Sequence, residues 1–177
     1  MNPLFLAHLV ADFLLQPKWL VEWKEKNHRG VVIHALLHAF AMVVVLVPRQ
    51  PDVFALIAGI ALTHGLIDSI KIRYQRKKKN FEGLFLADQL AHLFILIGAS
   101  FLLPSIPAFW TSEIGRLIFI IVLVFSFGVA WWNLSHLQKF PLKTLTERLA
   151  RFALLALVFA LFAIPSLLLS SSFCSWL

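Results

Sequence analysis

Four pairs of ionisable residues lie inside apolar stretches of the sequence, and the two members of each pair are four residues apart. In a helix this spacing puts both side chains on one face, about one turn apart. Ionisable groups at membrane depth cost at least a few kcal/mol each unless they are paired or bind a metal, so a group of eight indicates a shared role. The pairs are His8 and Asp12, His34 and His38, His64 and Asp68, and Asp88 and His92.

Imidazole and carboxylate groups are the ligands that zinc, iron and manganese use in proteins. Two such pairs suffice to enclose one ion and four pairs to hold two, as in helical bundles that build dinuclear sites from inward-facing acids and histidines. Three aspartates together with two divalent ions would give the site a net charge of about +1, which suits a bound hydroxide or an anionic substrate. All eight side chains are predicted metal ligands, and an aspartate or histidine among them that does not bind the metal would accept a proton. The predicted catalytic groups are Asp12, Asp68 and Asp88.

Several other polar residues lie near these pairs along the chain. Gln16 and Gln89 are expected to hydrogen-bond between helices and to be available to support the ligands. Lys71 follows Asp68 by one turn; extension to lipid headgroups is favoured for it over contact with a substrate, although it remains a candidate support residue. His28 in a hydrophilic loop and His136 near an interface are excluded as ligands.

The composition shows which elements must carry these residues. Of 177 residues 60% are hydrophobic and 14% are charged, and the mean hydropathy is +0.83, whereas soluble domains are nearer half and one quarter. This excludes a soluble enzyme, a nucleic-acid-binding module and a disordered chain as first interpretations. The single cysteine, Cys174, allows no internal disulfide and no zinc-finger spacing.

The apolar stretches predict an all-α, polytopic transmembrane bundle of about six spans, since a bilayer requires about 20 residues per helix. The first four spans would form the polar core, within residues 1–104. Residues 105–177 would form a two-span hairpin that acts as a scaffold or a homo-oligomer surface. The first span is short, and its helix is expected to continue along the interface through Trp19 and Trp23. The predicted spans are Pro3–Gln16, Gly30–Val47, Val53–Ile72, Phe81–Leu103, Ile114–Leu137 and Leu145–Leu169.

Basic residues indicate the orientation of these spans. Fourteen of the sixteen lysines and arginines fall in the first, third and fifth connections, and Arg49 and Arg116 are the two exceptions. The positive-inside rule then places those connections in the cytoplasm and both termini outside. The net charge of +7 is explained by topology and anionic lipid headgroups, without a nucleic-acid partner.

Depth in the membrane gives an independent check on the four pairs. Their members lie four to twelve residues from the cytoplasmic ends of the predicted spans, which is roughly 6–18 Å at the helical rise. All four pairs are therefore expected to meet in one layer of the bundle.

These motifs resemble a known family. The strings 6-LAHLVADFLLQ-16, 34-HALLH-38, 64-HGLIDSIK-71 and 86-LADQLAH-92, occurring in this order, are similar to the bacterial domain of unknown function (DUF) 3307. The resemblance covers about the first hundred residues and implies a polytopic protein of the bacterial inner membrane with no assigned reaction. A weaker similarity, in pattern only, exists to membrane-bound metal-dependent hydrolases that carry histidines on their helices, and it transfers no residue.

Two classes of function remain open. One is a metal-dependent hydrolase that acts at the cytoplasmic leaflet on a lipid-linked or phosphorylated substrate, with one or two zinc, iron or manganese ions; a di-iron oxidative enzyme is a related version. The alternative is a transporter or channel for divalent cations or protons. A transporter predicts polar residues toward the outer face, but the segment after His92 is apolar. Val44, Leu46, Ile57 and Phe94 are expected to seal that side.

Overall fold

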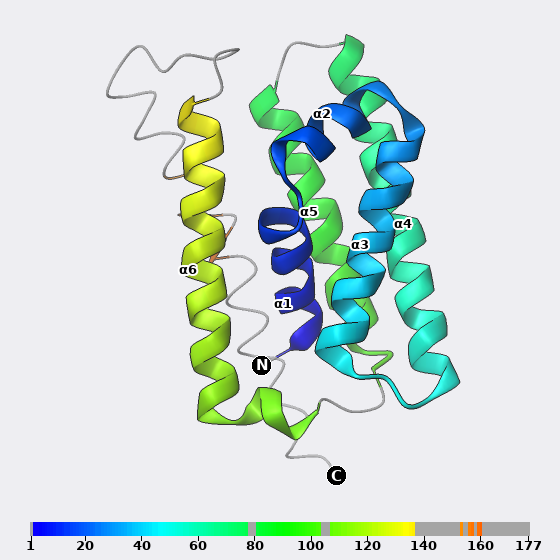
Figure 1. Cartoon of the computed structure of the whole chain (residues 1–177), viewed down its shortest axis with the longest axis vertical. Coiled ribbons are helices and arrows are strands. Elements are labelled where there is room, and N and C mark those ends of the chain that lie inside the picture. The colour runs from blue at the N-terminus through cyan, green and yellow to red at the C-terminus, as the bar shows by residue number, and fades with distance from the viewer. Residues whose placement is uncertain are drawn as a thin grey trace.

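The computed structural model describes residues 2–77, 81–103 and 107–136, together with residues 153, 156, 157, 159 and 160. All regular structure within these ranges is helical, which confirms the predicted all-α class (Figure 1). In chain order the elements are α1 (Pro3–Leu9), the π-helical turn η1 (Val10–Leu14), α2 (Lys18–Lys26), α3 (His28–Leu46), α4 (Pro51–Lys77), α5 (Phe81–Ser100), the 3-10 turn η2 (Ala108–Thr111) and α6 (Glu113–His136).

Within the described ranges, α3 and α4 are long and apolar enough to cross a membrane. A third crossing is added if the bent pair Pro3–Leu14 and Lys18–Lys26 forms one broken span. The 20-residue α5 and the 24-residue α6 coincide with the predicted fourth and fifth spans. Most of the predicted sixth span, Leu145–Leu169, lies outside the described residues, so the count of six spans stays a prediction.

The first predicted span differs from a continuous helix. Its α-helical geometry changes to a π-helical turn at Val10, where the Leu15 amide donates to the Val10 carbonyl oxygen at 2.9 Å. Pro17 then precedes α2, whose axis is turned by 89° from that of the first segment. The predicted interfacial continuation through Trp19 and Trp23 is thus a separate helix that lies across one end of the bundle (Figure 1).

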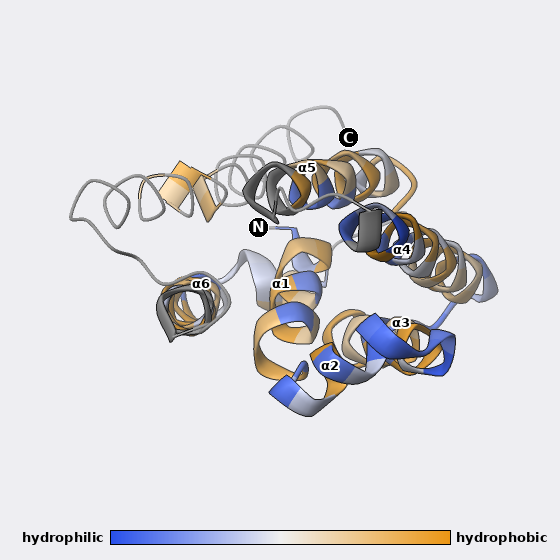
Figure 2. Cartoon of the chain, turned by 90° about the horizontal axis from the view of Figure 1, so that it is seen from above, coloured by the Kyte–Doolittle hydropathy of each residue, from blue (hydrophilic) through white to orange (hydrophobic). Residues whose placement is uncertain are grey.

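Helix α1 lies at the centre of the molecule. All seven of its residues are buried, and it packs against α3, α5 and α6, which surround it when the chain is seen from above (Figure 2). Asn2 begins the helix by accepting a hydrogen bond from the Leu4 amide, and its Nδ2 atom donates to Ser100 Oγ of α5 at 2.6 Å. This cap satisfies a helix-end amide that would otherwise be unpaired in an apolar environment.

Close backbone packing fixes α2 on α3. A Cβ atom on Gly30 would lie 2.5 Å from the Lys24 amide nitrogen and 2.7 Å from Lys24 Cα, so only glycine permits this approach. Two further side chains connect segments that are distant in the sequence. Trp110 of η2 donates to the Val45 carbonyl oxygen at 2.8 Å, and Phe159 contacts the rings of Phe13 and Phe127.

Large apolar side chains cover the outer surfaces of the long helices. Such extensive exposure is unusual for a soluble monomer and is typical of surfaces that face lipid or another protein. Together with the length and hydropathy of α3 and α4, it indicates that the chain inserts into a membrane. Representative exposed residues are Leu36, Phe40 and Val44 on α3, Leu62, Leu66 and Ile70 on α4, and Ile120 and Val124 on α6.

Candidate metal centre

The four sequence pairs meet in one buried cluster between α1, η1, α3, α4 and α5. The His8 ring centroid lies 5.2 Å from that of His38, 5.7 Å from that of His64 and 5.2 Å from that of His92. Every one of the five histidines is at most 3% exposed. The expectation that the pairs converge in one layer is met by this geometry.

Asp12 is held at the centre of one group of potential ligands. It lies in the π-helical turn η1, a kind of irregularity that is frequent at functional sites. Its Oδ1 atom is 3.0 Å from His34 Nε2, 2.9 Å from His38 Nε2 and 3.9 Å from His64 Nε2, and its Oδ2 atom is 3.4 Å from His8 Nε2.

Asp68 lies beside this group and contacts a lysine from another helix. Lys24 Nζ of α2 is 2.9 Å from Asp68 Oδ2, and the two side chains are only 10% and 3% exposed. Lys24 belongs to the connection between the first two predicted spans, and the sequence indicated no role for it at the site. The 89° turn before α2 brings Lys24 back over the cluster, where Gln16 lies between it and His34.

Asp88 makes a second lysine–carboxylate contact at the edge of the cluster. Lys71 Nζ is 2.6 Å from Asp88 Oδ2, and Gln89 Nε2 donates to the same oxygen at 3.3 Å. The preference for Lys71 to extend to lipid headgroups is therefore wrong: α4 and α5 pack together, and the ammonium group is directed to a buried carboxylate. Asp88 Oδ1 is 3.6 Å from His92 Nε2.

Two sets of potential ligand atoms satisfy the distance requirement for a metal ion. One set is Asp12, His34, His38 and His64; the other is His64, Asp68 and His92; within each set all the atoms lie within 4.8 Å of one another. His8 and Asp88 are adjacent to these sets without belonging to them. His64 belongs to both sets. Its Nε2 atom is buried and has no hydrogen-bond partner within the described part of the chain.

The first set also has dimensions that suit a tetrahedral ion. Bonds of 2.0–2.2 Å to nitrogen and oxygen place neighbouring tetrahedral ligand atoms about 3.4 Å apart. The distances from Asp12 Oδ1 to the three histidine nitrogens, from 2.9 to 3.9 Å, bracket that value. The donor atoms present therefore fit a transition metal such as zinc.

Apolar side chains close one side of the cluster. A cavity of about 10 Å³, roughly the space of one water, is lined by His8, His38, His64 and His92 together with Met42, Ile60, Ile95 and Leu96. Of the four residues expected to seal the outer side, Leu46 and Ile57 are buried, whereas Val44 and Phe94 are 57% and 70% exposed. The latter two are on the outer faces of their helices.

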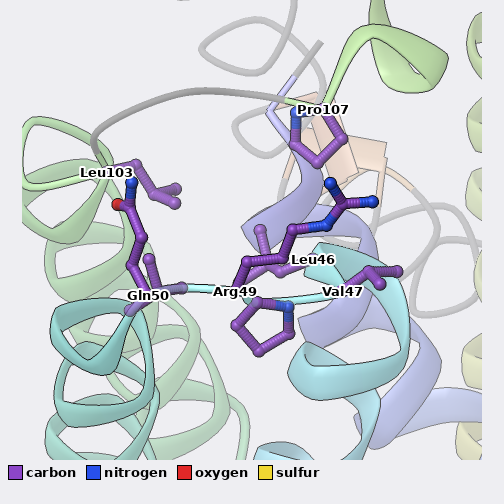
Figure 3. Close-up of a pocket in the computed structure, with 8 residues that line it drawn as sticks. Leu46, Val47, Arg49, Gln50, Leu103 and Pro107 are labelled. Carbon is purple, nitrogen blue, oxygen red and sulfur yellow. The ribbon is translucent and has the colours of Figure 1, made fainter.

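A larger cavity, of about 350 Å³, lies away from the histidines at the other end of α3. Leu46, Val47, Arg49, Gln50, Leu103 and Pro107 are among its lining residues (Figure 3). It contains no member of the two ligand sets, so the candidate centre is the buried cluster and not this cavity.

The fold and this cluster define an all-helical protein with membrane-type helices and a buried histidine–aspartate site. The chain belongs to the family described as "Protein of unknown function (DUF3307)", whose model matches residues 1–114. This confirms the family resemblance noted from the four motifs. Neither the curated proteins nor the solved structures provide a match to the chain.

Proposed function

We propose that this chain is a membrane-embedded metalloprotein whose buried cluster binds one or two divalent transition-metal ions. The observation that carries this proposal is the unpaired Nε2 atom of His64, buried between two sets of ligand atoms within the described residues. A buried polar atom without a partner is costly, and coordination to an ion removes that cost.

The ligand sets suggest how many ions bind. Because one imidazole nitrogen binds one ion, the set Asp12, His34, His38 and His64 accounts for a first, four-coordinate ion. A second ion would take Asp68 and His92, with further positions left to water or substrate. That open coordination would be required for catalysis, since catalytic sites retain an exchangeable position.

Hydrolysis of a lipid-linked or phosphorylated substrate at the cytoplasmic leaflet is the chemistry we propose for the site. A divalent ion held there supplies Lewis acidity, which makes hydroxide available near neutral pH. The oxygen of water bonds to the phosphorus or acyl carbon while the bond to the leaving oxygen breaks; a carboxylate takes the proton of the water, and the leaving oxygen gains a proton. Asp88 suits proton acceptance, since it belongs to neither ligand set and its Oδ1 atom has no hydrogen-bond partner among the described residues.

Elemental analysis of the protein purified in detergent tests metal binding. Wild-type protein is expected to carry about one or two transition-metal ions per chain, and the His64→Ala variant to lose most of this content. The control is Arg29→Ala, because Arg29 is exposed and outside both sets. Metal-free wild-type protein whose melting temperature does not rise with added zinc, iron or manganese would refute the proposal and leave a metal-free proton pathway.

The catalytic step needs a separate measurement. In the metal-loaded protein, Asp88→Asn is expected to keep the metal content and to lower hydrolysis of a phosphate ester by about 10²–10⁴-fold, the usual contribution of a general base. An Asp88→Asn variant with unchanged turnover would show that another group accepts the proton.

Transport is the second candidate, and one structural observation favours it. The bent helix pair Pro3–Leu14 and Lys18–Lys26 is interrupted beside the cluster, and broken helices form ion sites in many transporters. Against it, Met42, Ile60 and Leu96 close one side of the site. Reconstituted vesicles are therefore expected to show no protein-dependent flux of zinc, manganese or protons. A flux that disappears in Asp68→Asn would establish the transport function instead.

A further inference from the structure

A small basic cleft lies next to the metal cluster, at the corner where α2, α3 and α4 meet. Its volume is about 60 Å³, and its lining residues are Lys24, His28, Val31, Ser69, Ile72 and Arg73. Val31 precedes His34 by three residues on α3, and Ile72 follows Asp68 by four residues on α4. The cleft is thus one helical turn, about 5 Å, beyond the Asp68 layer.

The chemistry of the lining favours an anion. Lysine, histidine and arginine supply three basic side chains, and the lining contains no carboxylate, while the Ser69 hydroxyl donates to the Gly65 carbonyl oxygen at 2.8 Å. Lys24 links the cleft to the metal cluster, because its ammonium group contacts Asp68 at 2.9 Å while its side chain also lines the cleft. An ammonium group has three N–H donors, so Lys24 can contact both a carboxylate and a bound anion.

The charge of the cluster also changes sign when metal binds. Three aspartates and two paired lysines give −1 with neutral imidazoles; one divalent ion makes this +1 and two make it +3. The value of +1 expected from the sequence for two ions counted the three aspartates alone, and the contacts of Lys24 and Lys71 add two positive charges to it. A metal-loaded cluster therefore requires an anion nearby to balance a buried positive charge.

We infer that this cleft binds the phosphate group of a phosphate monoester, with Arg73 and Lys24 as its principal donors. The inference rests on the proposed function and deepens it, since it names the substrate class and the place where the phosphate is held. Arginine offers a planar fork that matches phosphate oxygens, and lysine adds a point charge. From the cleft, the ester bond would reach the ions about one helical turn away.

Thermal unfolding in lipid nanodiscs tests the inference. Phosphatidic acid in a phosphatidylcholine nanodisc is expected to raise the melting temperature of the metal-loaded protein, and Arg73→Gln to remove at least half of that shift. Arg29→Gln is the matched control, because Arg29 is exposed near the same end and does not line the cleft. Glycerol 3-phosphate, added to phosphatidylcholine nanodiscs, distinguishes a soluble source of the phosphate from a lipid source.

Two results would overturn the inference. The first is that Arg73→Gln and Arg29→Gln reduce the shift in melting temperature by the same amount. The second is that phosphatidylglycerol, a diester, raises the melting temperature as much as phosphatidic acid does, independently of Arg73. Elemental analysis of the same samples separates this from the proposed function. If the protein contains metal but phosphatidic acid causes no Arg73-dependent shift in melting temperature, the phosphate cleft alone is refuted. If the shift depends on Arg73 in protein that contains no metal, the cleft is supported and the metal centre is refuted.

Discussion

At the residue scale, Lys24 provides the counter-charge for a carboxylate that is almost fully enclosed by protein. The Asp68 side chain is 3% exposed, and Lys24 Nζ is its closest cationic contact at 2.9 Å. Removal of one member of a buried ion pair leaves the other charge uncompensated, which typically costs 3–5 kcal/mol. Because Asp68 also belongs to a ligand set, a metal ion is able to replace this lysine as the neighbouring cation.

We therefore expect Lys24→Met to destabilise the metal-free protein by about 3 kcal/mol. Chemical or thermal unfolding in detergent measures this change, and saturating zinc is expected to restore part of it. Lys18→Met on the same helix is the control, since Lys18 is 84% exposed and its contact with Glu22 is 3.9 Å long. Equal effects of the two substitutions would contradict the assignment of Lys24 as a buried counter-charge.

The sequence was informative about the residues of the cluster and much less so about their supports. The spacing of four identified all eight clustered side chains, because the helix period puts such pairs on one face. Lys24 gave no comparable signal: it lies among other charged residues in Lys18–Lys26, and only the turn of 89° brings it to Asp68. Lys71 was assigned the wrong direction because the packing of α4 against α5 cannot be read from one helix alone.

At the scale of elements, the position of α2 depends on Gly30. Backbone atoms of Trp23 and Lys24 occupy the space that a side chain at this position would need. The contact between α2 and α3 in turn places Lys24 over Asp68, so a shift of α2 is expected to separate the ion pair.

Gly30→Ala is expected to destabilise the protein by about 1–3 kcal/mol, the usual cost of overpacking. Gly59→Ala is the control, and it is expected to stabilise the protein. No atom lies within 4 Å of a Cβ atom built at Gly59. Alanine in a helix interior is more stable than glycine by about 0.5–1 kcal/mol. Melting temperatures of the two variants provide the measurement. A stabilised Gly30→Ala variant would show that α2 does not require this close contact.

The ends of most helices could be predicted to within a few residues, because prolines and charged residues interrupt the apolar stretches. The π-helical turn could not, since a hydrogen bond between Val10 and Leu15 leaves no periodic signature in the sequence. Pro17 indicated a break, yet the angle of that break depends on the packing of α2 against α3.

At the scale of the whole molecule, the lysines of α2 and the two exceptional arginines, Arg49 and Arg116, lie at opposite ends. Lys26 is in the last turn of α2 at one end, while the loop containing Arg49 and the beginning of α6 with Arg116 lie at the opposite end (Figure 1). This distribution underlies the predicted orientation, in which the α2 end faces the cytoplasm.

Cysteine labelling tests the orientation. In a Cys174→Ser background, Gln50→Cys is expected to react with a membrane-impermeant thiol reagent on intact cells, and Lys26→Cys only after permeabilisation. Both positions are exposed, so access and not burial determines the reaction. The reverse pattern would place the cluster near the outer leaflet.

The short central helix has a consequence for how the protein enters the bilayer. The segment formed by α1 and η1 contains 12 residues and is about 18 Å long, well below the roughly 30 Å of a hydrocarbon core. It carries His8 and Asp12, whose partners are on α3, α4 and α5, helices that are synthesised later. Because the segment is too short to cross the hydrocarbon core alone and its polar partners lie on other helices, we expect its stable insertion to depend on packing against α3 and α5.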